Sequence, residues 1–518
     1  MSAAYDAIIV GAGQAGPALA GRLTAAGMRV ALVERHLFGG TCVNTGCMPT
    51  KALVASAEVA HLARRGADYG VQIGGDVTVD FPKVMARAHT VTMNARRNVE
   101  RWLHGMEQLT VLRGHARFVA PDTLQVGEMT IRAPRVFLNV GGRAAVPPLP
   151  GVDAIDYLTN TSILQLDTLP RHLAVVGGSY IGLEFAQMFR RFGAQVTVIE
   201  RQSRLIARED EDVSAAIREI LEAEGIAVRT GAECIAFAPQ ADGIAVKVDC
   251  TDGAPEVVAS HVLLAMGRRP NTDDLGLDRA GVATDERGYI TVDDTLASNV
   301  PGIWAMGDCN GRGAFTHTAY NDFEIIAANL LDGDHRTLSQ RVPGYALYID
   351  PPLGRVGMTE AQARASGRPL LVSKRPMTRV GRAVERGQTE GFMKLVADAE
   401  TKRVLGAAIL GVSGDEAIHG VSADPSDGVR ALADRGAGAA AAGGRLGAHR
   451  RGFSAASRVR HNALAIRASP ALRRRRGIVF LRLSAAAYPA RPGDRRHRAG
   501  CGPAHAGPAR CRTVRPAR

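Results

Sequence analysis

The hydrophobic pattern predicts the same strand–helix–strand unit twice. Apolar runs predict two pairs of buried strands, at residues 8–10 and 29–33 and again at 173–176 and 195–199. Each pair encloses a glycine-rich segment and a helical pattern of apolar positions. Short, continuous apolar runs are typical of strands covered on both faces, and their alternation with helices predicts parallel sheets. The sequence therefore indicates an α/β protein with an internal repeat.

The pattern changes along the rest of the chain. Two further apolar runs, at 262–265 and within 302–308, end in glycine-containing turns and are expected to be buried strands. From residue 342 to 419 the runs are shorter, as at 391–397 and 404–411, which predicts a smaller α+β domain. After about residue 420 no sustained helical or strand period is present.

The glycine-rich segments are candidate dinucleotide sites. The first has Gly11, Gly13 and Gly16, and the second has Gly177, Gly178, Ser179 and Gly182. Glu34 and Glu200 each follow the first glycine of their copy by 23 positions. Glycines let the backbone approach a pyrophosphate at a helix N-terminus, and the acid can bind ribose hydroxyls. A packing role for glycine is the alternative, but two complete units favour two dinucleotides, a flavin and a nicotinamide.

Two cysteines lie in the segment Gly39-Gly40-Thr41-Cys42-Val43-Asn44-Thr45-Gly46-Cys47. An incidental buried pair and a metal site are the alternatives, and the other cysteines are too scattered to complete a metal site. Five residues of ideal helix rise about 7.5 Å, whereas bridged Cα atoms lie about 4.4–6.8 Å apart. The segment must therefore be distorted, which suits a reversible, redox-active disulfide.

Composition is that of a globular protein, with 46% hydrophobic and 22% charged residues. No apolar run approaches the roughly 18 residues of a membrane span, and residues 5–10 predict a strand where a signal peptide would lie. We therefore expect a cytoplasmic protein without membrane association. The net charge of +13 misleads, because residues 421–518 hold 21 Arg, no Lys or Glu and 4 Asp, leaving −4 for residues 1–420.

The basic tail has three interpretations. It is a nucleic-acid- or membrane-binding arm, an extension without a binding role, or an out-of-frame translation of GC-rich DNA, which yields Arg, Ala, Gly and Pro. We favour the third interpretation, and expect no nucleic-acid partner. A chain ending at residue 420 tests the binding arm, because loss of nucleic-acid binding with retained flavin would give the tail a role. An uninterrupted reading frame through codon 420, found by resequencing the gene, would contradict the out-of-frame interpretation.

The glycine loops together with the cysteine segment, which ends in Thr50-Lys51, resemble the class I pyridine nucleotide-disulfide oxidoreductase family over residues 5–420. Mercuric-reductase-like and dihydrolipoamide-dehydrogenase-like members are the most similar. The resemblance implies two Rossmann-type, three-layer domains, a truncated α+β interface domain and an irregular basic tail. The implied boundaries are FAD-binding 1–150 and 276–341, NAD(P)-binding 151–275, dimerisation 342–420 and tail 421–518.

The resemblance also assigns residues. FAD is expected to contact Gly11, Gly13, Gly16, Glu34, Gly40, Thr41, Lys51, Ala116 and Asp308, with the helix after Phe315 pointing at the isoalloxazine. The nicotinamide cofactor is expected to contact Gly177, Gly178, Gly182, Glu200 and Gly267. Catalysis is assigned to Cys42, Cys47, Lys51 and Glu184. Cys47 would be the flavin-proximal thiol and Cys42 the thiol that attacks the acceptor, with Lys51 paired to Glu184.

The implied reaction passes hydride from the nicotinamide to FAD and reducing equivalents on to the cysteine pair. Glu200 favours NADH over NADPH, although Arg201 and Arg204 could accommodate a 2′-phosphate. The acceptor would be a small molecule, a disulfide or a metal ion, and no resident metal site is predicted.

The C-terminal region departs from the family. Disulfide-reducing members carry a His–Glu pair there, but no Glu follows Glu416 in this chain. Mercuric reductases end in adjacent cysteines, whereas Cys501 and Cys511 are separated. The family is homodimeric, and we expect both dimerisation and disulfide turnover to be impaired here. The alternative functions are an NAD(P)H diaphorase or transhydrogenase and, from another class, a flavoprotein that binds nucleic acid or membrane through its tail.

Overall fold

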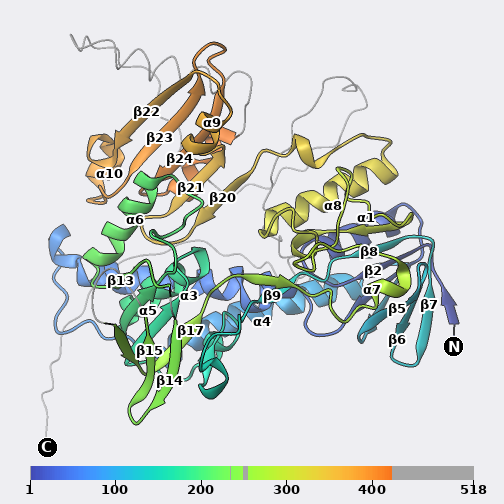
Figure 1. Cartoon of the computed structure of the whole chain (residues 1–518), viewed down its shortest axis with the longest axis horizontal. Coiled ribbons are helices and arrows are strands. Elements are labelled where there is room, and N and C mark those ends of the chain that lie inside the picture. The colour runs from blue at the N-terminus through green and yellow to red at the C-terminus, as the bar shows by residue number, and fades with distance from the viewer. Residues whose placement is uncertain (1, 234, 249–254, 423–518) are drawn as a thin grey trace, which may run out of the picture. The chain divides into compact units, whose positions relative to one another are not determined.

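The computed structural model describes residues 2–233, 235–248 and 255–422, which lie within one compact unit, Met1–Arg445 (Figure 1). The predicted tail at 421–518, with Cys501 and Cys511, falls outside the described residues except for its first two positions. Among the helices that the structure describes, none is both long enough and apolar enough to cross a membrane.

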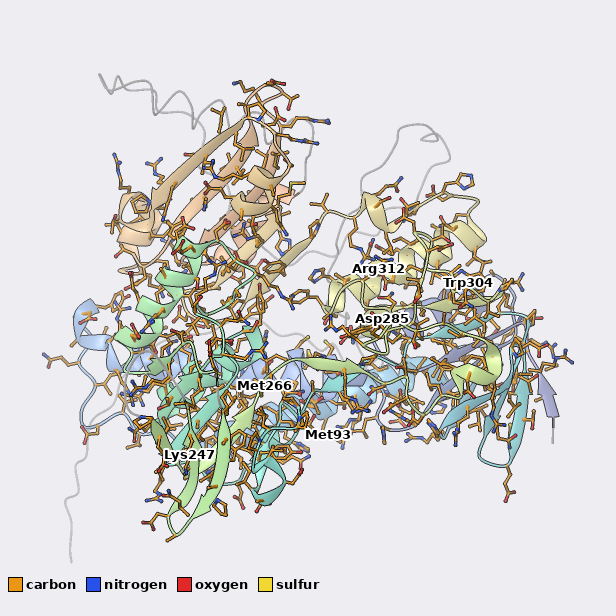
Figure 2. All side chains as sticks on the ribbon, in the orientation of Figure 1. Met93, Lys247, Met266, Asp285, Trp304 and Arg312 are labelled. Carbon is orange, nitrogen blue, oxygen red and sulfur yellow. The ribbon has the colours of Figure 1, made fainter. Side chains whose placement is uncertain are left out.

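A five-stranded parallel sheet, in the order β19-β8-β2-β3-β4, forms the core of the first dinucleotide unit. Its strands are β2 (Ala7–Val10), β3 (Val30–Glu34), β4 (Leu109–Arg113), β8 (Val136–Leu138) and β19 (Ile303–Ala305). All four residues of β2 are buried, as its continuous apolar run predicts. β19 arrives from far along the chain, and its Trp304 (labelled in Figure 2) stacks on Phe137 of β8 with ring centroids 5.0 Å apart.

Helices α1 (Ala15–Ala25) and α8 (Thr316–Leu331) pack against each other on one face of this sheet (Figure 1). Another sheet, in the order β1-β7-β6-β5, belongs to the same unit. Its strands are β1 (Ser2–Ala4), β5 (Ala116–Ala120), β6 (Thr123–Val126) and β7 (Met129–Arg132), and the short helix α7 (Leu277–Ala280) contacts β5.

The second parallel sheet has the order β10-β17-β11-β12-β13 and confirms the predicted internal repeat. Its strands are β10 (Tyr157–Leu158), β11 (His172–Val176), β12 (Gln195–Ile199), β13 (Ala227–Arg229) and β17 (His261–Leu264). Helix α5 (Tyr180–Phe192) joins β11 to β12, and α6 (Glu211–Ala223) leads to β13. A three-stranded antiparallel sheet accompanies it, made of β14 (Ala236–Gln240), β15 (Gly243–Lys247) and β16 (Glu256–Ala259).

Two connections link these units. Helix α3 (Cys47–Arg64), which follows α2 (Gly40–Thr45), packs against both α4 (Phe81–His104) and α5. Strands β9 (Gly142–Ala144) and β18 (Arg268–Pro270) form an antiparallel ribbon. Each strand lies where the chain passes from one parallel sheet to the other. The cysteine-bearing segment therefore lies against helices of both dinucleotide units.

The C-terminal part is an antiparallel sheet in the order β20-β21-β24-β23-β22. Its strands are β20 (Gly344–Leu347), β21 (Leu353–Gly357), β22 (Leu370–Pro376), β23 (Phe392–Asp398) and β24 (Val404–Leu410), and its helices are α9 (Glu360–Ala365), α10 (Gly381–Glu385), α11 (Gly414–Ala417) and α12 (His419–Ser422). Short 3-10 helices complete the described chain at Gly66–Tyr69, Val152–Ala154, Ser162–Gln165, Gly307–Asn310, Leu338–Gln340 and Met377–Arg379. The α/β class, with two Rossmann-type sheets and a smaller α+β part built on β20 to β24, is thus confirmed.

Candidate redox and dinucleotide sites

The first glycine loop connects β2 to α1, and its glycine positions leave no room for a side chain. Gly11 has φ +105°, and a Cβ atom there would lie 2.2 Å from the carbonyl oxygen of Asn139. A Cβ atom on Gly16 would lie 2.2 Å from the carbonyl oxygen of Gly11, and one on Gly13 would lie 3.0 Å from Asn139 Oδ1. The glycines therefore let the loop turn tightly into α1, whose N-terminal N–H groups favour an anionic group.

Glu34 stabilises this loop from the end of β3. Its Oε2 accepts a hydrogen bond from the Ala12 N–H at 2.8 Å, and its Oε1 accepts one from the His36 N–H at 2.8 Å. Each carboxylate oxygen has a second lone pair, so both can also accept bonds from ribose hydroxyls. The loop and its acid are therefore held together without a ligand.

Asn139 is a loop residue that the sequence analysis missed. Its buried Oδ1 accepts from the Gly16 N–H at 3.0 Å, and its Nδ2 donates to the Met306 carbonyl at 3.2 Å. Asn139 directly follows the apolar strand β8 and precedes Gly141-Gly142. A polar residue between an apolar run and a glycine pair was the available signal.

The second glycine loop has the same construction. Gly177 has φ +118°, and a Cβ atom on Gly182 would lie 2.0 Å from the Gly177 carbonyl oxygen. Glu200, at the end of β12, accepts from the Gly178 N–H at 2.6 Å and from the Gln202 N–H at 2.8 Å. The two predicted acids therefore make the same pair of backbone contacts in the two copies.

The neighbouring arginines differ in their contacts. Arg204 donates to the Ala207 carbonyl at 3.2 Å, and Arg201 is exposed. Gly267, in the turn before β18, has φ +120°, and a Cβ atom there would meet nothing within 4 Å. The positive φ favours glycine at this position, and the open space beside it leaves room for a ligand.

The cysteine segment is a helix broken between its two sulfurs, as predicted. α2 ends at Thr45, Gly46 has non-helical angles of φ −139° and ψ −119°, and α3 starts at Cys47. Gly40, the first residue of α2, has φ +60°, and a Cβ atom there would lie 2.9 Å from the Gly13 Cα. The segment with Thr41 and Cys42 is therefore packed directly on the first glycine loop.

Cys42 and Cys47 are free thiols that are mostly buried. A hydrogen bond from Cys42 lowers the pKa of Cys47 to about 6, with further help from the Thr316 hydroxyl and the Lys51 charge and against the effect of burial. The bond to Cys47, followed by burial, raises the pKa of Cys42 far above its ordinary range. In the reduced pair, ionisation is therefore favoured at Cys47 over Cys42.

Thr316, also missed by the sequence analysis, contacts the sulfur of Cys47. Its Oγ1 lies 3.0 Å from Cys47 Sγ. Thr316 is the first residue of α8, so the positive end of the helix dipole also faces the sulfur. No motif marks a threonine that is 269 positions away from its partner.

Lys51 and Glu184 form the predicted ion pair. Lys51 Nζ lies 2.6 Å from Glu184 Oε2, and the lysine and glutamate side chains are 34% and 9% exposed. Glu184 Oε1 accepts from the backbone N–H of Tyr348 at 3.0 Å. The pair thereby joins α3, α5 and the end of β20 beside the cysteines.

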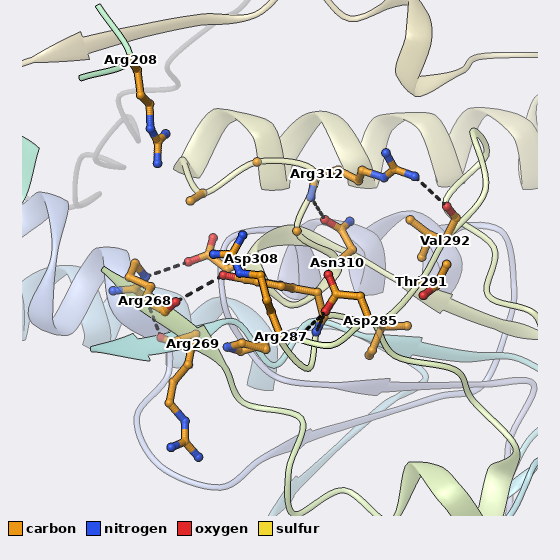
Figure 3. Close-up of a pocket in the computed structure, with 17 residues that line it drawn as sticks. Arg208, Arg268, Arg269, Asp285, Arg287, Thr291, Val292, Asp308, Asn310 and Arg312 are labelled. Atoms are coloured by element: carbon orange, nitrogen blue, oxygen red, sulfur yellow. Dashed lines mark hydrogen bonds and ion pairs between the residues drawn. The ribbon is translucent and has the colours of Figure 1, made fainter. Parts of the chain in front are cut away.

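Asp308 lines a cavity of about 460 Å³ in the first unit (Figure 3). Burial raises the pKa of Asp308, and Arg268 opposes this from 3.2 Å. Ala116, which the resemblance assigns to the FAD contacts, is buried at the start of β5 and does not line this cavity. The predicted residues thus fall into four places: the first loop with the cysteine segment, the second loop, this cavity, and β5.

The residues present fit two dinucleotides. In both glycine loops a Cβ atom would clash with neighbouring backbone, so only glycine allows the close approach of loop and helix that a dinucleotide cradle needs, and each loop has a helix N-terminus and an acid in place. Gly11, Gly16, Glu34 and Asp308 would hold FAD, and Gly177, Gly182 and Glu200 would hold the nicotinamide cofactor. A cluster of three or more metal-binding side chains is absent from the described residues.

Comparison with known proteins gives the same picture. Residues 5–322 match the family model of pyridine nucleotide-disulphide oxidoreductases, and residues 344–431 match the model of that family's dimerisation domain. A mercuric reductase of Streptomyces lividans is 37% identical over 412 residues, which cover 78% of this chain and 86% of the relative. A dihydrolipoyl dehydrogenase of Chlamydia pneumoniae is 33% identical over 415 residues, covering 79% and 88%.

A solved structure is also similar. The Cu(II) complex of the HOCl-induced flavoprotein disulfide reductase RclA from Escherichia coli has a TM-score of 0.73 and 34% identity, and the match covers 83% of this chain and 93% of that one. Two glycine cradles, a thiol pair and these matches agree with one another. The chain belongs to the pyridine nucleotide-disulphide oxidoreductase family, as an FAD-dependent enzyme that uses NAD(P)H.

Proposed function

We propose that this protein oxidises NADH, or less readily NADPH, and passes the electrons through the pair Cys42 and Cys47 to an acceptor that reacts with dithiols. The observation that carries the proposal is the contact between Cys47 Sγ and Thr316 Oγ1, with the Lys51–Glu184 pair beside it. FAD, when bound, supplies the two-electron chemistry between the nicotinamide and the sulfurs.

The thiols have different roles in this proposal. Cys47, whose thiolate is stabilised by Cys42, Thr316 and Lys51, is the sulfur next to the flavin. Cys42 holds the proton of the reduced pair and attacks the acceptor after losing it. The ammonium group of Lys51 is the positive charge that acts on Cys47. Glu184 binds this group and balances its charge.

Glu200 supports the preference for NADH. Its carboxylate occupies the position where the ribose would bind, and a carboxylate repels a 2′-phosphate. Both its oxygens already accept backbone hydrogen bonds, so its charge is fixed in place. Arg201 and Arg204 offer positive charge to the 2′-phosphate of NADPH, which we therefore propose as a weaker substrate.

The acceptor class includes small disulfides and thiophilic metal ions. The named relatives include a mercuric reductase and a dihydrolipoyl dehydrogenase, and RclA was solved as a Cu(II) complex. The His–Glu pair of disulfide-reducing family members cannot form after Glu416, because no Glu follows it in this sequence. Without this acid–base pair, we propose that protonation of a thiol leaving group is slow. Disulfide turnover is therefore expected to be slower than electron transfer to an acceptor that needs no such proton.

Anaerobic titration of the FAD-loaded protein with NADH tests the proposal. A long-wavelength charge-transfer band is expected on reduction, and Cys47→Ser should abolish it while FAD stays bound. Cys309→Ala is the matched control, because this buried thiol bonds to the backbone carbonyls of Leu138 and Met306 rather than to the cysteine pair, and its loss should leave the band intact. Persistence of the band in Cys47→Ser would disprove the assignment, and parallel assays with a disulfide and with a metal ion identify the acceptor.

A further inference from the structure

Tyr348 lies at the junction of the C-terminal sheet and the Lys51–Glu184 pair. It directly follows β20, and its backbone N–H donates to Glu184 Oε1 at 3.0 Å. Glu184 Oε2 is bonded to Lys51 Nζ at 2.6 Å. One carboxylate therefore connects the lysine of α3 to the backbone of Tyr348.

The ring of Tyr348 makes a second contact with the lysine. Lys51 Nζ lies 4.3 Å from the ring centroid, well inside the roughly 6 Å range in which a cation is attracted to an aromatic face. A lysine side chain has a flexible four-carbon stem, and a single ion pair restrains it poorly. The carboxylate and the ring together restrict the ammonium group from two directions.

The surroundings keep the Tyr348 phenol neutral. Burial raises its pKa to about 12, and the charges of Asp415, Glu184, Cys47 and Glu416 act in the same direction. The phenol is therefore no base at physiological pH, and the ring face is the group that acts on Lys51.

We propose that Tyr348 is a positioning residue for the redox centre: its ring, packed on Lys51 while its backbone N–H binds Glu184, holds the ammonium charge beside Cys47. This inference builds on the proposed function, because it assumes that the Cys47 thiolate is the working sulfur. It goes further by giving the C-terminal domain a direct part in the redox chemistry of its own chain.

The other groups that face Cys47 come from different elements. Cys42 approaches from α2 and Thr316 from α8, and Lys51 is on α3 itself. Because the phenol is neutral, the ring of Tyr348 acts on Cys47 through Lys51, so the effect of removing the ring should vanish when the lysine charge is absent. This dependence separates positioning from a general packing role.

The test compares Tyr348→Leu with Tyr348→Phe in the full-length, FAD-loaded protein. Two measurements are made against pH: the charge-transfer band, and the rate at which iodoacetamide alkylates Cys47, located by mass spectrometry. Tyr348→Leu is expected to raise the midpoint of both by about half a unit, a threefold loss of thiolate acidity. Tyr348→Phe retains the ring and should restore the original midpoint.

Two controls complete the design. Tyr69→Leu removes a ring from under Arg65, whose guanidinium lies 5.7 Å from the centroid, and should leave both midpoints unchanged. In a Lys51→Met background, Tyr348→Leu should cause no further shift. If Tyr348→Leu is too unstable to purify, Tyr348→Met replaces it, because it also removes the ring while keeping a large side chain.

The outcomes distinguish the two proposals. An unshifted midpoint in Tyr348→Leu, or a shift that persists in the Lys51→Met background, overturns the role of Tyr348. Absence of the charge-transfer band from the unsubstituted protein contradicts the proposed function instead, and the alkylation midpoints still decide the role of Tyr348.

Discussion

The sulfur of Cys47 lies 3.0 Å from the hydroxyl of Thr316, at the N-terminus of helix α8. This contact brings together residues from the two ends of the first dinucleotide unit. It aims a hydroxyl donor and a helix dipole at a thiol whose pKa is lowered to about 6, chiefly by Cys42. Charge at Cys47 is therefore favoured by groups that are in place before any substrate arrives.

Thr316→Ala should weaken the thiolate. Loss of one hydrogen bond to a charged sulfur raises the pKa of Cys47 by about one unit. Because the ionised form gives the charge-transfer band, the band should appear at higher pH than the unsubstituted midpoint near 6. Spectra of the reduced protein between pH 5 and 9 measure this shift, and Thr316→Ser, which retains the hydroxyl, should show little of it.

Glu34→Ala should weaken FAD binding by about tenfold or more. The substitution leaves the Ala12 N–H without its partner and removes the acceptor for the ribose. Fluorescence of released flavin during dilution measures the affinity. Glu128→Ala, on an exposed turn, is the control, and equal flavin retention in both variants would contradict the role of Glu34.

Glu200→Gln should change the choice of nicotinamide. The amide keeps the size of the side chain and removes the negative charge that repels a 2′-phosphate. We expect the ratio of kcat/KM for NADH to that for NADPH to fall by about tenfold. Steady-state rates with both cofactors give the ratio, and an unchanged value would place the selectivity elsewhere, with Arg201 and Arg204 as the next candidates.

Arg355→Met should destabilise the protein strongly. Arg355 is 1% exposed and pairs with Glu209, whose side chain is fully buried, and with Asp210. Removing the guanidinium takes the pairing cation away from the fully buried Glu209 carboxylate, to which the Tyr345 hydroxyl still donates, and this costs about 3–5 kcal/mol. Urea unfolding followed by circular dichroism measures the loss. Arg382→Met, at a side chain that is 71% exposed, should cost less than about 1 kcal/mol.

Local patterns predicted the repeated parts of the site. The spacing from Gly11 to Glu34 and from Gly177 to Glu200 reflects a single supersecondary unit, so the position of both acids at the end of the second strand could be anticipated from the sequence, although their backbone contacts were not. The break between Cys42 and Cys47 followed from comparing the rise of an ideal helix with the Cα separation that a disulfide allows, and the structure places it at Gly46. These features depend only on residues close together in the chain.

Long-range contacts could not be predicted in this way. Asn139, Thr316 and Tyr348 reach the site from loops and helix ends whose positions depend on how the sheets pack. The pairing of Lys51 with Glu184 bridges 133 positions, and only the family resemblance suggested it. No period or motif within the segments of Thr316 or Tyr348 reveals which distant residue they meet.

Strand β19, at Ile303–Ala305, completes the edge of the first sheet beside β8, although the whole second dinucleotide unit lies between them in the chain. During synthesis, the first sheet therefore emerges from the ribosome without its outer strand and without α8. At that stage Phe137 lacks its stacking partner Trp304, and Cys47 lacks its contact with Thr316. The order of translation makes the second unit available before the first can finish folding, so flavin capture should be a late event in the maturation of this enzyme.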